Sequence, residues 1–246
     1  MSLRALGRRL PEPLKRSAQR LLRRLAYQWG PHLMSELRKR WVILSHPGAT
    51  IRFEGPVHIA SGFTLHFHRP GRGTFIVGPN VEFRRNFLAE LGDRARIEIK
   101  EGCIIGYDAV LAATTSIELD KYCILAPSVY VSDGKHDYSR DVHKPMIGRG
   151  YRYQPVRLGT HSGVYTKSTV MASVGDRSMV LGHSLVREPI PPNYAAAGVP
   201  ARLTWYFGPP DEEPDEGRRE RLAWEAERQS RRMSQTGGED AASAPA

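Results

Sequence analysis

Apolar residues recur every six positions through the middle of this chain. They form the runs Leu119, Leu125, Val131, then Leu158, Val164, Val170, and after a shift Val174, Val180, Val186. A β-strand alternates every two residues and an α-helix turns every 3.6, so neither alone gives a period of six. A solenoid with three short strands per turn does, because each strand supplies one inward-facing apolar residue. The spacing therefore predicts a β-helix.

Two further positions of the repeat fit this interpretation. Glycine follows the apolar residue at Gly78, Gly92, Gly106, Gly159 and Gly175, and we interpret these glycines as corners that need permissive backbone angles. Four positions after the apolar residue the side chain is small, at Ala95, Cys103, Ala109, Cys123, Ser162, Ser168, Ser178 and Ser184. A narrow triangular interior requires this, because two bulky inward groups would overfill it. An antiparallel sandwich would instead show alternation of period two and hairpin turns.

Cysteine usage and hydropathy indicate the compartment. Cys103 and Cys123 fall at inward positions of the repeat, and no CxxC or His-spaced zinc pattern surrounds them. We expect both to be small core residues. Without a disulfide framework, a reducing, cytoplasmic compartment is the default. No apolar run approaches the ~18 residues that a transmembrane helix needs, so we expect no membrane-spanning segment.

The positive charge of the chain is concentrated at its N-terminus. The formal net charge is +10, and residues 1–40 hold eleven Lys and Arg against two Glu. Spacing of leucines predicts an amphipathic helix from Pro13 that ends at Gly30-Pro31, and a shorter one from Leu33 to Trp41. A basic amphipathic helix suits peripheral contact with the inner face of an anionic membrane. Alternatively, its apolar stripe packs on the open end of the solenoid. No binding motif accompanies the charge, so nucleic acid is not an expected partner.

A long loop interrupts the repeat. Residues 132–155 follow directly after Val131 and contain His136-Asp137-Tyr138. An excursion of this length from a compact solenoid is more often functional than not. Its tyrosines and arginines, Tyr138 and Arg140 among them, suit the recognition of a sugar. A solvated loop face explains the arginines equally well.

The segment that closes the repeat is distinctive. Residues 187–202 read REPIPPNYAAAGVPAR. With the repeat and its interrupting loop, this segment resembles the hexapeptide-repeat acyltransferases, in their sugar and polysaccharide O-acetyltransferase branch, across residues 51–205. The resemblance implies an all-β fold, the left-handed parallel β-helix, assembled as a homotrimer. It also implies acetyl-CoA or another acyl-CoA as co-substrate, no metal, and a hydroxyl of a cell-surface glycan or its lipid-linked precursor as acceptor.

The catalytic histidine of the family maps onto His136. A sugar hydroxyl must lose its proton as it attacks the thioester carbonyl, and a neutral imidazole, with an ordinary pKa of about 6.5, can accept that proton. Asp133 or Asp137 is close enough in sequence to orient the imidazole, and a backbone carbonyl would serve as well. The resemblance places the oxyanion donor, a backbone N–H, at Thr166. The coils would then hold His136 opposite Thr166.

The sequence departs from the family pattern beside Thr166. Gly163 and Tyr165 stand where the family has Trp and Gly, and the step from Val170 to Val174 is two residues short. The resemblance further implies that coenzyme-binding residues are Thr166, Arg187, Ala196, Gly198 and Arg202. It implies Tyr138, Arg140 and His143 as contacts of the acceptor.

Three regions follow from these patterns. We expect a basic helical arm in residues 1–50, the β-helix domain in 51–207, and a charged, partly disordered tail with a short helix in 208–246. Two other functions remain open, namely acetylation of a small xenobiotic and a non-catalytic scaffold. A zinc hydratase on the same fold would need three converging histidines, and the spacing of the histidines does not provide them.

Overall fold

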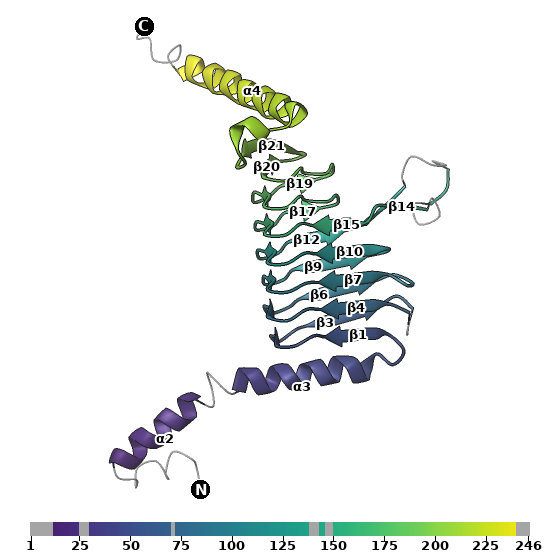
Figure 1. The fold of residues 1–246 in the computed structure, drawn as a ribbon, viewed down its shortest axis with the longest axis vertical. Helices are drawn as coiled ribbons and strands as arrows, with labels where there is room; N and C mark the ends of the chain where they lie inside the picture. Colours follow the sequence, from purple (N-terminus) through teal and green to yellow (C-terminus); the bar gives the residue numbers. More distant parts are fainter. Residues whose placement is uncertain (1–11, 25–29, 70–71, 138–142, 146–149, 240–246) are drawn as a thin grey trace.

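The computed structural model describes residues 12–24, 30–69, 72–137, 143–145 and 150–239. Its centre is a stack of coils, with a helix across one end and another helix beyond the other end (Figure 1). Each of the first five coils contributes one strand to each of three faces, which we call sheets A, B and C. Neighbouring strands within each face come from successive coils, and the chain therefore winds as a parallel β-helix.

The strands of each sheet are short. Sheet A contains β1 (Thr50–Phe53), β4 (Thr74–Val77), β7 (Arg96–Ile99), β10 (Ser116–Leu119) and β15 (Val156–Leu158). Sheet B contains β2 (Val57–Ile59), β5 (Val81–Phe83), β8 (Ile104–Ile105), β11 (Ile124–Leu125), β16 (Gly163–Val164), β18 (Met179–Val180), β20 (Tyr194–Gly198) and β21 (Ala201–Tyr206). Sheet C contains β3 (Thr64–Phe67), β6 (Leu88–Leu91), β9 (Val110–Ala113), β12 (Tyr130–Ser132), β17 (Thr169–Val170) and β19 (Leu185–Val186).

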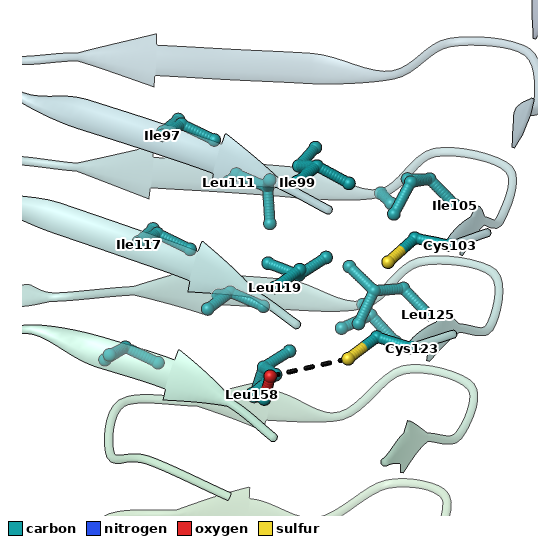
Figure 2. Close-up of a cluster of buried hydrophobic side chains, with 14 of the residues drawn as sticks. Ile97, Ile99, Cys103, Ile105, Leu111, Ile117, Leu119, Cys123, Leu125 and Leu158 are labelled. Carbon is teal, nitrogen blue, oxygen red and sulfur yellow. Dashed lines mark hydrogen bonds between the residues drawn. The ribbon is translucent and has the colours of Figure 1, made fainter. Parts of the chain in front are cut away.

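The register explains the period of six. Leu119 pairs with Leu158 in sheet A, while Leu125 pairs with Val164 and Val131 with Val170 in the other two sheets. Inward residues of one coil therefore stack on those of the next, and Figure 2 shows this ladder of apolar side chains. Bridges from Leu158 to Val174 and from Val174 to Ile190 extend sheet A past the short step.

Both cysteines lie in this core, as predicted. They are fully buried free thiols. The thiol of Cys103 donates to the carbonyl oxygen of Asp120 at 3.0 Å, and that of Cys123 to Gly159 at 3.1 Å. Each thiol thus satisfies a carbonyl of the following coil while filling the narrow part of the interior.

The glycines that follow the apolar positions are required for a reason other than the one we predicted. None of Gly78, Gly92, Gly106, Gly159 and Gly175 has a positive φ. A Cβ at Gly106 would instead lie 2.6 Å from the backbone of Ala126 in the next coil. Gly78, Gly159 and Gly175 are similarly crowded, and at Gly92 the nearest atom would lie 3.2 Å away. The positive φ values occur mostly at non-glycine residues of the turns, for example Ser128 and Lys167. Space between coils, rather than backbone angle, selects glycine.

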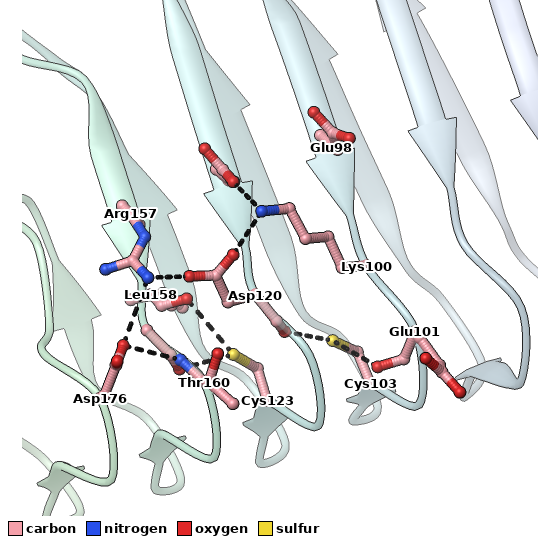
Figure 3. Close-up of polar contacts among 12 residues, drawn as sticks. Glu98, Lys100, Glu101, Cys103, Asp120, Cys123, Arg157, Leu158, Thr160 and Asp176 are labelled. Carbon is pink, nitrogen blue, oxygen red and sulfur yellow. Dashed lines mark hydrogen bonds and ion pairs between the residues drawn. The ribbon is translucent and has the colours of Figure 1, made fainter.

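A row of alternating charges joins the coils on sheet A (Figure 3). The nearly buried carboxylate of Asp120 accepts a hydrogen bond from Lys100 at 2.6 Å and forms an ion pair with Arg157, which also contacts Asp176. Burial opposes ionisation of Asp120, but Lys100 and Arg157 outweigh it and lower the pKa of this carboxyl. Because Arg157 follows the long loop and Asp120 precedes it, this row ties together the two coils between which the loop is inserted.

In the described residues before the solenoid lie two helices, α2 (Glu12–Arg24) and α3 (Gly30–Ser45). Gly30 begins α3, which is longer than the short segment predicted from Leu33 to Trp41. Helix α3 lies across the open end of the first coil (Figure 1). Among the described residues, no helix is long and apolar enough to cross a membrane.

Helix α3 covers the solenoid mainly with polar side chains, and Val42 is the one apolar residue of this helix that is buried. The hydroxyl of Ser35 donates to the carbonyl of Val57 and accepts from the N–H of Ile59, and Arg38 donates to the Ile59 carbonyl at 3.0 Å. These bonds satisfy backbone groups of the first coil, which has no preceding coil to pair with. The apolar stripe consequently faces away, and Leu33, Leu37, Trp41 and Leu44 are exposed. The expectation that an apolar stripe covers this end is therefore wrong for α3.

The other end is closed by β20 and β21, which pair antiparallel, followed by η3 (Pro210–Glu212) and α4 (Asp215–Glu239). The buried carboxylate of Glu213 accepts two hydrogen bonds from Arg221 at 2.9 Å, which lower its pKa. The backbone N–H of Leu203 donates to Glu220 at 3.3 Å. Helix α4 is thus longer than the short helix predicted for the tail, and it is anchored to the cap.

We predict that Gly106→Ala destabilises the protein while Gly163→Ala does not. The added methyl group at Gly106 meets backbone of the adjacent coil, whereas at Gly163 nothing lies within 4 Å. Overpacking of this kind costs about 1–3 kcal/mol, which lowers the thermal unfolding midpoint by about 2–4 °C per kcal/mol in a chain of this size. Thermal unfolding followed by circular dichroism measures both. Equal midpoints for the two variants would contradict the role assigned to this corner.

Candidate functional site

The loop that interrupts the repeat carries a small hairpin away from the solenoid (Figure 1). Strands β13 (Gly134–His136) and β14 (Tyr151–Tyr153) pair antiparallel, with His136 opposite Tyr151. At its base, the N–H of Gln154 donates to the carbonyl of Asp133 at 2.8 Å. The hairpin leaves after β12, at the corner between sheets C and A, and the chain re-enters at β15.

Asp133 anchors this hairpin. Its nearly buried carboxylate accepts hydrogen bonds from the backbone N–H groups of Thr114, Thr115 and Ser116, each at 2.6 Å, and from the Thr115 hydroxyl at 2.8 Å. Both oxygens are therefore committed to the turn of the preceding coil. We predicted Asp133 as one of two aspartates that could orient His136, and these contacts support a structural role instead.

The second aspartate, Asp137, also has a defined partner. Its carboxylate is buried and accepts a hydrogen bond from Nε of Arg152 at 3.0 Å. Its N–H donates to the carbonyl of Gly150 at 3.0 Å, extending the hairpin pairing beyond His136. Successive residues of a strand point to opposite faces. The Asp137–Arg152 pair therefore fixes the backbone beside His136 from the opposite face of the hairpin.

His136 is exposed beside two tyrosines. Its ring centroid lies 4.2 Å from that of Tyr151, and the rings of Tyr151 and Tyr153 stack at 5.7 Å. These side chains face a hollow of about 510 Å³ that reaches over the corner ends of the preceding coils. His68 lines it there together with charged groups of both signs, Arg69, Glu90 and Asp93.

The predicted acceptor contacts are only partly described. Tyr138 and Arg140 lie outside the described residues, and His143 is exposed. Tyr151 and Tyr153 belong to the loop tyrosines that we expected to suit sugar recognition, but we did not predict them as individual acceptor contacts. The alternating pattern Tyr-Arg-Tyr after the loop was the available signal, because it places both rings on one face of a strand.

Thr166 lies at a different corner of the coil. It belongs to the turn between β16 and β17, at the corner between sheets B and C. Pro127 occupies the same turn position one coil earlier, since Lys167, which follows Thr166, donates its N–H to the Pro127 carbonyl at 3.1 Å. Sheet C separates this corner from His136, a span on the order of 10–15 Å at ~3.3 Å per residue. Within one chain, His136 and Thr166 therefore lie at different corners of the coil.

The closing segment places its predicted coenzyme residues in three environments. Ala196 is fully buried in the core and its carbonyl accepts from Leu181, so its side chain faces no surface. Gly198 and Arg202 border a hollow of about 520 Å³ beside α4. Arg187 lines a smaller hollow of about 390 Å³, which Arg202 also borders. The prediction for Ala196 fails because strand alternation turns it inward, while Gly198 and Arg202 are accessible.

Metal chemistry has no support in the described part of the chain. Within the described residues, no group of three or more His, Cys, Asp or Glu side chains is placed to hold a metal ion. His161 stacks on Tyr122 at 5.1 Å, at a corner away from His136. The converging histidines of a zinc hydratase are thus not found among these residues.

Comparison with known proteins finds acetyltransferases that are similar to this chain. Over 151 residues the chain is 30% identical to the probable acetyltransferase Rv3034c of Mycobacterium tuberculosis. This match covers 54% of this chain and 50% of that protein. Over 186 residues it is 24% identical to galactoside O-acetyltransferase of Escherichia coli. That match covers 73% of this chain and 74% of the enzyme. The chain is a relative of acetyltransferases. No family profile matches it.

The fold agrees with this relationship. A crystal structure of a point mutant of AntD, an N-acyltransferase from Bacillus cereus, in complex with dTDP and coenzyme A superposes with a TM-score of 0.56 at 18% identity. The match covers 68% of this chain and 88% of that one. The predicted fold class, a left-handed parallel β-helix of hexapeptide repeats, is confirmed. The chain spans half the length of the mycobacterial protein that it matches.

We predict that Asp133→Asn loosens the hairpin and destabilises the fold by about 1–3 kcal/mol. The amide nitrogen of asparagine cannot accept a hydrogen bond, so at least one buried donor of residues 114–116 loses its partner. Thermal unfolding measures the loss. Asp211→Asn, an exchange at an exposed position, is the matched control and should change stability by less than about 0.5 kcal/mol. A Tm for Asp133→Asn equal to that of the control would remove the anchoring role.

Proposed function

We propose that this chain is an acyl-CoA-dependent O-acyltransferase, in its simplest form an O-acetyltransferase. Its acceptor is a hydroxyl of a sugar in a cell-surface polysaccharide or in its lipid-linked precursor. The observation that carries the proposal is His136, held on a projecting hairpin beside Tyr151 over a hollow. The relationship to galactoside O-acetyltransferase and the fold shared with a coenzyme A-bound acyltransferase support the reaction class.

His136 acts as general base. Its imidazole accepts the proton of the sugar hydroxyl while the oxygen attacks the thioester carbonyl carbon. The negative charge that develops on the carbonyl oxygen is stabilised by the backbone N–H of Thr166. Collapse of the tetrahedral intermediate breaks the carbon–sulfur bond, forms the sugar ester, and returns the proton from the imidazolium to the coenzyme thiolate.

The site forms between two copies of the chain. Because sheet C lies between His136 and Thr166 in one chain, one copy cannot supply both groups to the same thioester. A homotrimer with cyclic symmetry brings one corner of each copy beside a different corner of its neighbour, which creates three identical sites. Each site then takes its base from one copy and its oxyanion donor from the next.

Coenzyme A runs along the corner between sheets B and C. Tyr165, Leu181 and Ala197 follow the paired residues Val164, Val180 and Ala196, so they form an outward row at the same edge. Tyr165 and Leu181 are exposed and give the pantetheine arm an apolar surface. The row leads from the Thr166 turn toward Gly198 and Arg202.

The acceptor lies in the hollow beside His136. Tyr151 and Tyr153 offer two ring surfaces, and sugar rings pack on aromatic faces while their hydroxyls bond to charged groups. Glu90, Asp93 and Arg69 surround the opening with such groups. This mixture of charges suits a polyhydroxylated acceptor with several hydrogen bonds to satisfy.

The arm in residues 1–40 brings the enzyme to the inner face of an anionic membrane. Helix α3 turns Leu37, Trp41 and Leu44 away from the solenoid, and α2 carries exposed arginines beside exposed leucines. Apolar side chains that enter the interface and basic ones that attract anionic headgroups are the two elements of such binding. A lipid-linked acceptor would be met at this surface.

We expect His136→Ala to lower acetyl transfer by at least about 10²-fold, and Thr166→Pro, which removes the backbone N–H, by a similar factor. Proline fits the turn, because Pro127 occupies this position one coil earlier.

Co-expressing both variants should restore about a quarter of wild-type activity. This is the share of sites in mixed trimers that receive an intact base from one copy and an intact oxyanion donor from its neighbour. Hydroxylamine-labile radioactive product from acetyl-CoA and a sugar acceptor is the readout.

Matched controls accompany this experiment. Thr166→Ala keeps the N–H, and His161→Ala removes a histidine at another corner, so both should retain wild-type transfer. Undiminished transfer by His136→Ala would exclude the proposed base. Absence of restoration in the mixture, with both variants folded and trimeric, would contradict a site shared between copies. A product that resists hydroxylamine would be an amide, which would contradict O-acylation.

For the membrane surface, we expect the full chain to co-sediment with vesicles containing anionic phospholipid and not with purely zwitterionic ones. Replacing Leu37 and Trp41 together by serine should weaken binding at least about 10²-fold, since each buried side chain of this size contributes about 1.5–3 kcal/mol. Trp205→Ser, at another exposed tryptophan on the far cap, is the control and should bind normally. Unchanged sedimentation of the double variant would rule out α3 as the contact.

A further inference from the structure

Helix α4 and the cap of the solenoid enclose a hollow of about 520 Å³. From the cap, the turn between β20 and β21 contributes Gly198, Val199 and Pro200, with Arg202 at the start of β21. From α4 come Trp224, Glu227 and Arg228. Neither the repeat nor the closing segment indicated that the tail takes part in a site.

The side chains from α4 are held in position. Trp224 and Arg228 are four residues apart and therefore share one face of the helix. The guanidinium carbon of Arg228 lies 5.2 Å from the centre of the Trp224 ring. The helix itself is fixed to the cap through Arg221 and Glu213 and through the bond from Leu203 to Glu220. The hollow is thus bordered by secondary structure on both sides.

The hollow lies along the corner between sheets B and C, the same corner that holds Thr166. The N–H of His183 donates to the Thr166 carbonyl at 3.0 Å, one coil further on, and the N–H of Gly198 donates to the Ser184 hydroxyl at 3.1 Å. Gly198 is therefore two coil steps beyond Thr166, about 10 Å at the usual spacing of neighbouring strands. The outward row Tyr165, Leu181 and Ala197 ends at this hollow, because Ala197 is part of its lining.

The chemistry of the lining suits a nucleotide. An indole ring provides a stacking surface for a purine, and a base stacked on an aromatic side chain is well stabilised. Two guanidinium groups, Arg202 and Arg228, offer paired donors to phosphate oxygens. Glu227 lies among them, so these three side chains carry a net charge of +1, which favours an anion.

We propose that α4 completes the site for the nucleotide end of coenzyme A, with Trp224 stacking on the adenine and Arg228 joining Arg202 at the phosphates. This inference rests on the proposed acyl transfer from a coenzyme A thioester. It adds that the charged tail is a binding element, which selects the donor by its nucleotide rather than by its acyl group.

The test compares donors with and without the nucleotide, using the full chain. In Trp224→Ala and in Arg228→Gln, the KM for acetyl-CoA should rise about tenfold, with kcat at saturation unchanged. The KM for S-acetylpantetheine, which lacks the nucleotide, should stay at the wild-type value. Leu222→Ala, an exposed residue of α4 outside the hollow, is the control and should leave both KM values unchanged.

Calorimetry with adenosine 3′,5′-bisphosphate separates the two proposals. Binding by the wild-type chain that weakens about tenfold in both variants supports the site even if no acetyl transfer is found, an outcome that would defeat only the proposed activity. Acetyl transfer with an unchanged acetyl-CoA KM in both variants would overturn the role of α4 and leave the activity standing. Equal increases of KM for both donors would also overturn it, because a general loss of structure explains them.

Discussion

The spacing between successive coils governs this molecule. Parallel strands of neighbouring coils are hydrogen bonded on all three faces, so every coil sits one strand spacing from the next. This distance leaves no room for a Cβ at Gly106, stacks Leu119 on Leu158, and lets the thiol of Cys103 reach a carbonyl of the following coil. The stack of coils therefore positions the segments inserted at its corners, including the hairpin of His136.

A parallel stack has two ends with unpaired backbone groups, and the chain closes each one differently. At the first coil, Ser35 and Arg38 of α3 bond to backbone groups of β2, so the helix presents its polar side to the protein. At the last coil, β21 pairs antiparallel with β20, and α4 is tied to the strands through Glu220. The first solution exposes an apolar stripe and the second creates a hollow. Both of our proposals beyond the catalytic centre arise from these two closures.

Much of the fold could be predicted from the sequence, because the period of six reports inward positions directly. The buried thiol of Cys103 and the loop after Val131 followed from it. What could not be predicted is how particular residues are placed relative to the interior and the corners of the coil. A second short step, from Val186 to Ile190, interrupts the period before Ala196, so the inward position of Ala196 was missed. The period also does not say that His136 and Thr166 belong to different corners. An amphipathic pattern likewise cannot reveal which face of a helix meets the protein when the surface that it covers is itself rich in unpaired backbone groups.

The way in which the long loop is inserted has a consequence for how such chains diversify. Strand β10 pairs directly with β15, as though residues 132–155 were absent, and Asp120 and Arg157 join across the junction. The carbonyl of Asp133 receives the N–H of Gln154, which closes the insertion at its base. The β-helix therefore does not depend on the length or sequence of the segment between these contacts. Loops of other sequence that keep a histidine in the place of His136 could be exchanged at this junction during evolution, or grafted by design, without refolding the rest.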